Sequence, residues 1–547
     1  MKIGGEAIMK RRRMCWVLGV SIILVAGSAL ADKTWTGATD GDFENGGNWG
    51  GTAPADDLTE LAIFSGSNPN QPILTTSRSI KGLRFNSTSR TILDDPANPP
   101  SPYTLTIGGS GIYNNSSGGD VTVGPDAVLS ISSSQTPVET RTGYLTIRAR
   151  ITGTGGVRFW GIDGEGNQDP FHVYGDNDYS GSTLLSRSTT VYVYHPNAFG
   201  TTAGDVVLNG WSGYRDEAIL RLHGNAAPNG LNANKHVRLD GDGELYVGGG
   251  ITLANDVAVS GARNVLGSYA SGAAYMTGTI TVPDGVSLTI SRYNTSGGTL
   301  RLNYNGSTVV GKITGGGSLN HSYSGSTHNR DLYIYGNNDY TGGTTMGVDY
   351  GCDNDIRVYS DTAFGLGPVY LQSSSTRPTF MLGASVTMPN DFRGVNGCTM
   401  NASTRTFTTT GAVRPGDTGL GATPTKNVGT FNIDGKLKFG SDTDGCTYYW
   451  HYNETSNDRI VPDTLELGSG GNVVECEWLG AGDPPTPPKS GTSYVLFTYT
   501  GTDPADVSWT VVPPNPLFTG VVSVDGANNR VLLTLYPPVP STVIKVQ

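Results

Sequence analysis

Side chains able to hold a cation gather most closely in a short stretch where acidic residues alternate with glycine. Asp240, Asp242 and Glu244 take every second position of it, so a strand or turn would place their carboxylates on one side. Carboxylate oxygens are the ligands that Ca²⁺ takes in proteins, and these three residues are therefore candidate calcium ligands. Their spacing is not that of an EF-hand loop. Acidic residues beside glycines are typical of solvated turns, which is the favoured interpretation.

A second acidic group consists of Asp349, Asp353 and Asp355, with Arg357 close behind. Such a set has the residue types of a polysaccharide lyase, in which a cation neutralises a uronate and an Arg or Lys acts as base. The seven histidines are scattered, and no HExxH, Gly-x-Ser-x-Gly or phosphate-loop pattern occurs. The sequence therefore predicts no catalytic residue, and no cofactor apart from the calcium candidate.

Trp160 and Trp211 are the candidate sugar-binding residues, because an exposed aromatic ring can stack on a pyranose. Both follow closely on the repeated motifs described below. The favoured interpretation is that each ring fills the small core of its own loop.

Four cysteines follow the predicted signal segment described below, namely Cys352, Cys398, Cys446 and Cys476. An even number in an exported chain allows two disulfides, whose pairing the sequence leaves open. No CxxC or CxxH spacing indicates a metal site. Disulfides and free buried thiols both remain as interpretations.

The elements that carry these residues are predicted to be short β-strands. Runs such as Tyr103–Ile107, Val191–Tyr194 and Val286–Ile290 alternate apolar with polar residues at period two. Glycine is abundant, with 78 residues, and only 15% of the residues are charged. That composition disfavours helices and favours tight turns. The chain is therefore predicted to be all-β.

One passage occurs twice, as VYGDNDYSGST at Val173–Thr183 and as IYGNNDYTGGT at Ile334–Thr344. Tyr179 of the first copy corresponds to Tyr340 of the second, and flanking motifs keep the same order. Sandwich domains would repeat as complete units. Short self-similar strands separated by Gly/Asn turns are instead typical of coils stacked as a parallel β-solenoid.

The solenoid prediction leads to three further expectations. At roughly 20–25 residues per coil, the chain would form roughly 20 coils, stacked at about 4.8 Å. Asn177 and Asn338 fall at matching turns, where asparagine tolerates the left-handed backbone conformation. Equivalent strands carry tyrosine pairs that could stack inside the core, and these are Tyr192, Tyr194, Tyr333 and Tyr335.

Residues 1–31 have the pattern of a secretory signal peptide. Lys10–Arg13 form a basic segment, Trp16–Ala26 an apolar core and Ala29–Ala31 a cleavage site of small residues. The apolar run is shorter than the roughly 20 residues that span a bilayer. Export is therefore expected, with no membrane span after cleavage. The start at Met1 or at Met9 stays open.

Removal of that segment takes away five basic residues and one acidic residue, which changes the net charge from −11 to −15. No basic stripe remains to bind phosphates, so nucleic acid is not an expected partner. Net acidity in an exported protein mainly favours solubility.

Composition divides the chain into four segments. Residues 1–31 are the signal peptide, 32–90 an N-terminal cap, 91–480 the solenoid, and 481–547 a Pro-rich loop followed by a C-terminal β cap. Caps are expected because a solenoid exposes strand edges at both ends. Within the C-terminal cap, Val521–Tyr536 is expected to fold back on itself as closing strands.

In these motifs the chain resembles bacterial exported proteins with autotransporter-associated β-strand repeats, whose pattern runs G-x-G-G-L, N-x-Y-T-G-G-T and A-L-G-x-G-x-V-x-L. The matching stations are Gly153–Val157, Asn177–Thr183 and Ala198–Leu208, then Gly315–Leu319, Asn338–Thr344 and Ala363–Leu371. The opening of the chain is similar to that of such proteins at Trp35–Gly37, Asn48–Trp49 and Ile80–Phe85. The resemblance implies a right-handed parallel β-helix at or beyond the cell surface, generally without a catalytic residue. The terminal membrane barrel of autotransporters has no counterpart in these residues, so self-translocation is not expected.

The sequence thus predicts an exported, non-enzymatic β-solenoid that acts as a cell-surface or extracellular scaffold or adhesin, with a periplasmic location as an alternative. Polysaccharides or other cell-surface ligands are the expected partners, and the oligomeric state stays open. The alternative function is a secreted polysaccharide-degrading or glycan-binding protein on the same scaffold. A purely structural subunit that assembles with itself is the third hypothesis.

Overall fold

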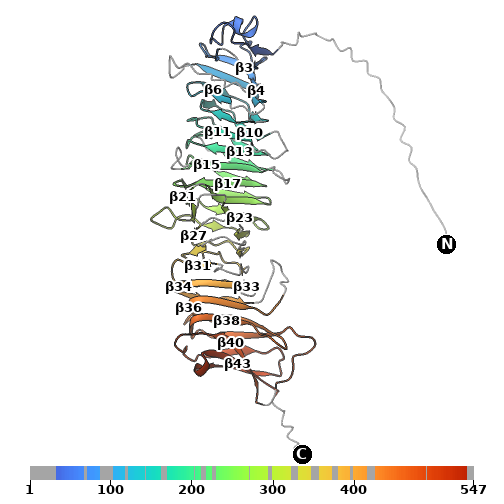
Figure 1. The fold of residues 1–547 in the computed structure, drawn as a ribbon, viewed down its shortest axis with the longest axis vertical. Coiled ribbons are helices and arrows are strands. Elements are labelled where there is room, and N and C mark those ends of the chain that lie inside the picture. The colour runs from blue at the N-terminus through green and yellow to red at the C-terminus, as the bar shows by residue number, and fades with distance from the viewer. Residues whose placement is uncertain are drawn as a thin grey trace, which may run out of the picture.

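The structure is a computed structural model, and it shows an all-β chain, 2% helical, whose parallel strands stack as a β-solenoid of about 14 turns. The turns form a long, narrow column, with the first described strands at one tip and β43 at the other (Figure 1). The structure describes residues 32–66, 70–86, 103–116, 121–141, 143–161, 169–201, 204–210, 217–223, 230–269, 271–292, 298–321, 331–346, 356–371, 380–394, 398–415, 426–487 and 490–538.

Three long sheets form the walls of the solenoid. Sheet 1 has 14 strands, and these are β1 (Lys33–Trp35), β2 (Leu61–Phe64), β3 (Arg78–Phe85), β4 (Thr104–Asn114), β6 (Val128–Ile131), β7 (Thr136–Thr140), β9 (Arg150–Gly153), β10 (Val157–Gly161), β12 (Thr183–Ser186), β14 (Val206–Asn209), β16 (Val237–Asp240), β19 (Val257–Ser260), β22 (Ile280–Thr281) and β25 (Ile313–Thr314).

Sheet 2 has 16 strands, and these are β5 (Val121–Val123), β8 (Leu145–Ile147), β11 (Asp169–Val173), β13 (Thr189–Val193), β15 (Ala218–Leu222), β17 (Gly243–Gly248), β20 (Asn264–Tyr269), β23 (Ser287–Arg292), β26 (Ser318–His321), β28 (Thr344–Met346), β30 (Val369–Leu371), β33 (Phe392–Gly394), β35 (Ala412–Arg414), β37 (Thr447–Tyr452), β39 (Asn472–Trp478) and β41 (Trp509–Val512).

Sheet 3 has 13 strands, and these are β18 (Thr252–Leu253), β21 (Gly272–Met276), β24 (Gly298–Leu302), β27 (Leu332–Ile334), β29 (Ile356–Val358), β31 (Phe380–Leu382), β32 (Val386–Met388), β34 (Cys398–Thr409), β36 (Thr430–Phe439), β38 (Arg459–Leu467), β40 (Thr492–Thr498), β42 (Thr519–Asp525) and β43 (Arg530–Tyr536). Two 3₁₀ turns, η1 (Gly46–Trp49) and η2 (Gly526–Asn528), complete the described elements.

The expected number of coils was an overestimate, because most turns take more residues than a minimal coil. Val237 pairs with Val206 on one side and with Val257 on the other, so these two successive turns differ in length. The turn in which Ile280 pairs with Ile313 is longer still. Loops between strands account for the difference, and a solenoid tolerates them because they leave strand register untouched.

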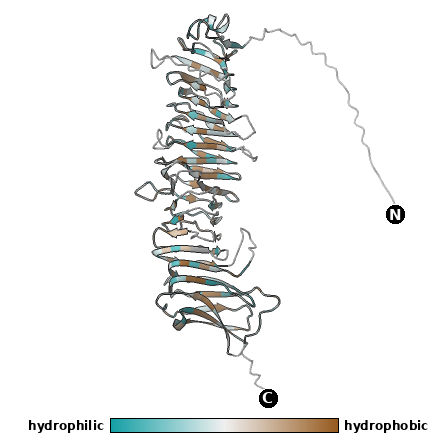
Figure 2. Ribbon diagram, viewed as in Figure 1, coloured by the Kyte–Doolittle hydropathy of each residue, from teal (hydrophilic) through white to brown (hydrophobic). Residues whose placement is uncertain are grey.

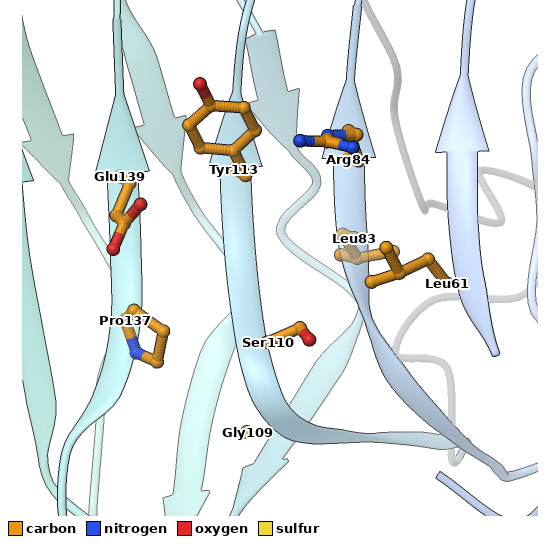
Figure 3. Close-up of a pocket in the computed structure, with 8 residues that line it drawn as sticks. All are labelled: Leu61, Leu83, Arg84, Gly109, Ser110, Tyr113, Pro137 and Glu139. Carbon is orange, nitrogen blue, oxygen red and sulfur yellow. The ribbon is translucent and has the colours of Figure 1, made fainter. Parts of the chain in front are cut away.

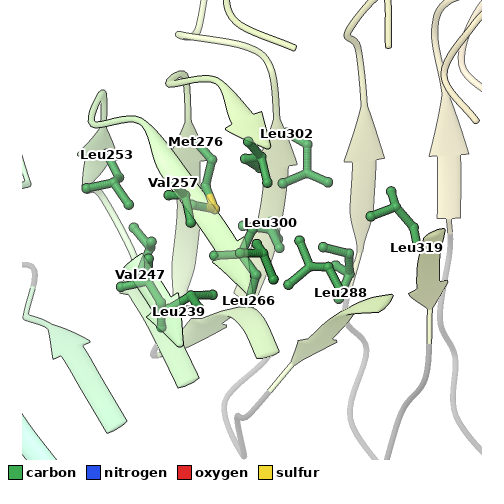
Figure 4. Close-up of a cluster of buried hydrophobic side chains, with 14 of the residues drawn as sticks. Leu239, Val247, Leu253, Val257, Leu266, Met276, Leu288, Leu300, Leu302 and Leu319 are labelled. Carbon is green, nitrogen blue, oxygen red and sulfur yellow. The ribbon is translucent and has the colours of Figure 1, made fainter. Parts of the chain in front are cut away.

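The core lies between the sheets and follows from the period-two pattern of the strands. Hydrophobic and hydrophilic residues are mixed along many of the strands (Figure 2), and every second side chain of a strand points inward. In the middle of the column, Leu239 of sheet 1, Leu266 of sheet 2 and Leu300 of sheet 3 all point into one apolar interior and are buried (Figure 4).

The two copies of the repeated passage occupy different corners of the solenoid. Asn177–Thr183 connects β11 of sheet 2 to β12 of sheet 1, whereas Asn338–Thr344 connects β27 of sheet 3 to β28 of sheet 2. Sheet 1 ends at β25 and sheet 3 begins at β18. The first copy therefore joins sheets 2 and 1, and the second copy joins sheets 3 and 2. We call these two segments the corner motifs.

The asparagines of the corner motifs bind neighbouring turns, and the prediction of a left-handed backbone there was wrong. Neither residue has a positive φ. Asn177 accepts a hydrogen bond from the Ile151 N–H at 2.7 Å and donates to the Ala198 carbonyl at 2.6 Å. Asn338 makes the corresponding bonds to Ile313 and Ala363, both at 2.8 Å.

The tyrosine pairs lie on the outside of the walls, and the prediction that they stack in the core was wrong. In β13, Val191 and Val193 point inward and are fully buried, so Tyr192 and the following Tyr194 point outward. The same phase places Tyr333 and Tyr335 outside β27. Aliphatic residues fill the interior instead, and the rings form stacks along the outer surface.

At the N-terminal end, the predicted cap contributes β1, β2 and β3 to sheet 1. Trp35 and Phe43 each pack edge-on against Trp49 with ring centres 4.9 Å apart. Phe64 stacks on Phe85 of the next strand at 5.2 Å. These rings are buried, and they fill the interior of the terminal turns.

At the C-terminal end, the chain folds back as expected. β42 and β43 form an antiparallel hairpin around η2, and β43 also pairs antiparallel with β40. All other pairs of named strands in the described part of the chain are parallel. Two consecutive strands joined by a short turn run antiparallel, so this hairpin ends the series of parallel turns.

Cys446 and Cys476 are free and buried, so the disulfide interpretation is wrong for these two residues. Cys476 lies opposite Trp450, and Cys446 immediately precedes the strand in which Thr447 lies opposite Val473. The two thiols are thus offset along the strands by more than a disulfide can span. Cys352 and the side chain of Cys398 lie outside the described residues.

Candidate functional site

A pocket of about 410 Å³ opens on the outer face of sheet 1, near the N-terminal end of the column (Figure 3). It lies over β2, β3, β4 and β7, which are consecutive strands of the sheet. The pocket is lined by Leu61, Leu83, Arg84, Gly109, Ser110, Tyr113, Pro137 and Glu139. Successive turns of the solenoid therefore contribute to one concave surface.

A glycine-rich bulge in β4 leaves the space that forms the pocket. Gly108–Ser110 lie opposite a single residue of β3, which bends the strand. Gly111 follows with a φ of 65°, and a Cβ there would lie 1.8 Å from the carbonyl oxygen of Pro137. A Cβ at Gly109, in contrast, would have no heavy atom within 4 Å. The hollow above Gly109 is open.

One outward row of side chains borders the hollow. Arg84 lies opposite Tyr113 in the register, Tyr113 opposite Glu139, and Glu139 opposite Trp160. Adjacent strands of a sheet lie about 4.8 Å apart, so each of these side chains reaches the next. Figure 3 shows the first three on neighbouring strands above the bulge. The row combines a cation, two aromatic rings and a carboxylate.

Arg84 is the charged residue of the row that has no ion-pair partner among the described residues. The guanidinium carbon of Arg84 lies 5.1 Å from the centre of the Tyr113 ring. Within the described part of the chain, no carboxylate lies within ion-pair distance of Arg84. Glu139, on the other side of the ring, is 3.5 Å from Arg158. Among the described residues, the pocket thus retains one positive charge without a carboxylate partner.

Trp160 extends this row, and it does not fill a loop core. It lies on β10, where Val157 and Phe159 point inward, and its side chain is half-buried on the outer face. The Arg158 guanidinium covers the ring at 4.6 Å from its centre. The predicted sugar-binding residue therefore lies one strand beyond the pocket, beside Glu139. Trp211 lies outside the described residues.

This arrangement suits a ligand that has both an apolar face and polar substituents. A tyrosine ring offers a flat apolar surface, a guanidinium offers up to five N–H donors in a fixed fork, and a carboxylate accepts hydrogen bonds. Pyranose rings have both kinds of surface, axial C–H groups and equatorial hydroxyls. In the part of the chain that the structure describes, the lining holds one carboxylate, Glu139, whereas most glycosidases use two.

No protein-family model and no curated protein matches this chain. The resemblance to proteins with autotransporter-associated repeats therefore stays a prediction, and the function is inferred from the site itself. Among the described residues, no helix is long and apolar enough to cross a membrane.

The candidate calcium ligands do not converge. Asp240 ends β16 and accepts hydrogen bonds from Arg238 at 2.6 Å and Ser260 at 2.5 Å. The chain turns a corner at the next two residues, so Asp242 is buried there and Glu244 lies on sheet 2. In the part of the chain that the structure describes, no three His, Cys, Asp or Glu side chains form a group that could hold a metal ion.

The corner also changes the environment of the two remaining carboxyls. Asp242 has a φ of 36°, and its Oδ2 lies 3.6 Å from Arg263. Burial raises the pKa of Glu244, which accepts a hydrogen bond from the Tyr246 hydroxyl at 3.0 Å. The second acidic group, Asp349, Asp353 and Asp355, lies outside the described residues.

A buried His–Asp pair in the C-terminal turns was not foreseen, and it is enclosed. His451 Nδ1 and the His451 backbone N–H both lie 2.9 Å from Asp458 Oδ2, while Gly429 N–H donates to Oδ1 at 2.6 Å. Both side chains are 1% exposed or less. Burial raises the pKa of Asp458. Because both side chains are enclosed, we assign the pair a structural role, in which Asp458 accepts backbone hydrogen bonds from Gly429 and His451.

The sequence did not point to Arg84, Tyr113 or Glu139, although it offered Trp160 as a candidate sugar-binding residue. Each lies at an outward position of its strand, which the structure shows. Their wide separations in the chain carry no motif, and only the register of the sheet brings them into one row. The Gly108–Gly111 run was the one signal in the sequence for a hollow at this point.

Proposed function

We propose that this protein is an exported, non-enzymatic β-solenoid scaffold that binds polysaccharide through the pocket on its outer face. The observation that carries the proposal is the row Arg84, Tyr113, Glu139 and Trp160 beside an open hollow. A flat ring next to donors and an acceptor is the composition of a sugar-binding surface. The rest of the column would hold this surface at a distance from its attachment point.

A binding role is favoured over catalysis by the chemistry of the lining. Acid–base hydrolysis of a glycosidic bond uses two carboxyl groups on either side of the bond, and among the described residues the lining supplies Glu139 alone. Glu139 is also paired with Arg158. A strand-based surface is rigid, so it suits repeated shallow contacts with a long polymer, whose avidity grows with the number of contacts.

The test is binding of the purified protein to immobilised polysaccharides, with release of reducing sugars measured in the same samples. Tyr113→Ala is expected to weaken binding at least tenfold, because the apolar platform is lost. Tyr370→Ala is the matched control. Tyr370, like Tyr113, has an arginine beside its ring, with Arg393 at 5.5 Å from the ring centre, but it lies on sheet 2, away from the pocket. Its binding is expected to be unchanged.

Gly109→Leu tests the same site by filling the hollow, whereas Tyr113→Ala removes a contact surface. A Cβ at Gly109 meets no heavy atom within 4 Å, so the backbone there accepts a side chain, and leucine is expected to occupy the hollow. Binding should be lost while the melting temperature stays within a few degrees. Binding that survives in both Gly109→Leu and Tyr113→Ala would refute the pocket as the binding site. Sugar release by the wild-type protein would refute the non-enzymatic role.

A further inference from the structure

We infer that the ligand of the pocket is an acidic saccharide, whose carboxylate pairs with Arg84 while its ring lies against Tyr113. This inference rests on the proposed polysaccharide-binding function and adds the chemical class of the sugar. A uronate residue, with a carboxylate attached to a pyranose ring, is the simplest unit with both features.

The state of Arg84 carries the inference. Its side chain is half-buried beside the pocket, and its partner among the described residues is the Tyr113 ring, 5.1 Å from the guanidinium carbon. A guanidinium binds a carboxylate through two parallel N–H···O bonds, which fix orientation as well as charge. The planar fork of Arg84 therefore remains available for an acceptor from outside the chain.

Several other outward arginines of the solenoid are satisfied by carboxylates of the chain itself. Arg148 and Arg301 resemble Arg84 in lying on tyrosine rings, but neither lines the pocket. Arg393 and Arg414 both bind Asp391, at 2.7 and 3.1 Å. Arg238 binds Asp240 at 2.6 Å. Each of these guanidinium groups has a carboxylate on the same or a neighbouring strand, as expected on an acidic surface.

Glu139 limits where the negative group of a ligand can sit. It lies on the far side of Tyr113 from Arg84, and its charge is offset by Arg158. A ligand carboxylate beside Glu139 would be repelled, whereas a hydroxyl there would donate to it. The pocket is thus polarised, with the anion at Arg84 and hydroxyls at Glu139. A ring with one carboxylate satisfies both ends.

The experiment compares oligosaccharides of equal length with and without the charge. Oligomers of galacturonate, mannuronate and glucuronate, and the methyl esters of each, are titrated into the purified protein by calorimetry. At least one free acid is expected to bind about ten to a hundred times more tightly than its methyl ester, the range for a charge-assisted hydrogen bond. The difference should shrink in high salt, because exposed charges are screened.

Variants of Arg84 assign that difference to one residue. Arg84→Gln should remove the preference for the acid, so that the acid and its methyl ester bind with similar affinity. Arg84→Lys should keep part of it, since charge remains but the fork is lost. Arg238→Gln, an outward arginine of the same sheet, is the control and should keep the full preference. Circular dichroism of each variant confirms the fold.

The outcomes separate this inference from the proposed function. Equal binding of acids and esters, abolished by Gly109→Leu, would overturn the acidic ligand and leave polysaccharide binding intact. Tighter binding of a sulphated oligomer than of any uronate would overturn the assignment to a carboxylate. Failure of every oligomer to bind, together with failure on immobilised polysaccharides, would overturn both.

Discussion

Single side chains fix the corners of this solenoid. Asn177 and Asn338 are buried, and each amide satisfies a backbone N–H of the preceding turn and a backbone carbonyl of the following one. Buried backbone groups cost free energy when left unpaired. Each amide therefore replaces hydrogen bonds that the chain cannot make where it leaves the sheet.

Asn338→Leu should destabilise the turns around it by about 2–4 kcal/mol, because Ile313 N–H and the Ala363 carbonyl lose their partner inside the protein. Hydrogen exchange is the suitable measurement, since long repeat arrays do not unfold in two states. The Ile313 amide should exchange faster. Asn337→Ala, at an exposed neighbour, should leave that rate unchanged, and equal rates in both variants would contradict the role of Asn338.

Lys235 is a buried amine without a hydrogen-bond partner in the described residues. Its Nζ lies 5.8 Å from the Tyr179 ring centre and fits beside Gly204, where a Cβ would approach it to 3.3 Å. Burial lowers its pKa from 10.5 to about 8. The unfolded chain therefore binds a proton that the folded chain has released between these two pH values.

The stability of the wild-type protein should consequently rise with pH between about 8 and 10.5, the range between the folded and unfolded pKa of Lys235. Lys235→Met should remove this rise and should be more stable at pH 7, since the buried charge is gone. Because the array does not unfold in two states, the urea midpoints of the two proteins at pH 7 and pH 9.5 are compared directly, without a fitted free energy, and this comparison measures both effects. A wild-type midpoint that does not change with pH would rule out the buried ammonium.

At the scale of elements, the outward tyrosines form stacks along the walls. Tyr335 lies between Tyr304 and Tyr359, with ring centres 4.1 and 4.2 Å away and nearly parallel planes. On sheet 2, Tyr174 stacks on Tyr194 at 4.1 Å. Because each ring covers the faces of its neighbours, these stacks join successive turns and offer little face to a sugar. The pocket differs in having open space beside its ring.

Tyr335→Ala should weaken the turns around β27 and β29 by about 1–3 kcal/mol, since two ring contacts are lost at about 0.5–1.5 kcal/mol each. Tyr304→Ala removes one ring at the end of the stack and should cost about half as much. Hydrogen exchange of the Ile334 and Val358 amides would measure both. An equal effect of the two variants would argue against stacking as the source of the stabilisation.

At the scale of the molecule, the column separates its two ends and places the pocket near the N-terminal one (Figure 1). Parallel pairing continues from turn to turn, and the antiparallel β40–β43–β42 group closes the far end. A closed end protects the sheet from pairing with further strands. This geometry fits the proposed role of a scaffold that holds a binding surface away from its base.

Protease treatment of intact cells should remove a cell-bound signal for residues 32–547, if the protein is displayed at the surface as proposed. The culture medium, probed in parallel, is expected to contain little of it. A signal that survives protease until the cells are lysed would place the protein inside the envelope. Recovery mainly from the medium would contradict attachment and favour release.

The sequence by itself determined the strands and the architecture. Period-two runs such as Val191–Tyr194 and the twice-written corner motif predict short parallel strands in coils, and β13 and its neighbours confirm them. Local pattern suffices there because alternation of side chains is a property of the strand itself. The alternation left open which set of residues faces inward, and the valines of β13, not its tyrosines, are buried.

Only the tertiary structure decided which distant residues meet. The carboxylates Asp240 and Glu244 are neighbours in sequence, yet a corner sends them to different sheets. Arg84 and Tyr113 are far apart in sequence, yet they lie side by side on β3 and β4. The physical reason is that loops of variable length make successive turns unequal, as the pairings of Val257 and Ile313 show. The hydrophobic pattern requires only that inward residues meet inward residues, and the length of each loop then decides which residues of successive turns lie side by side.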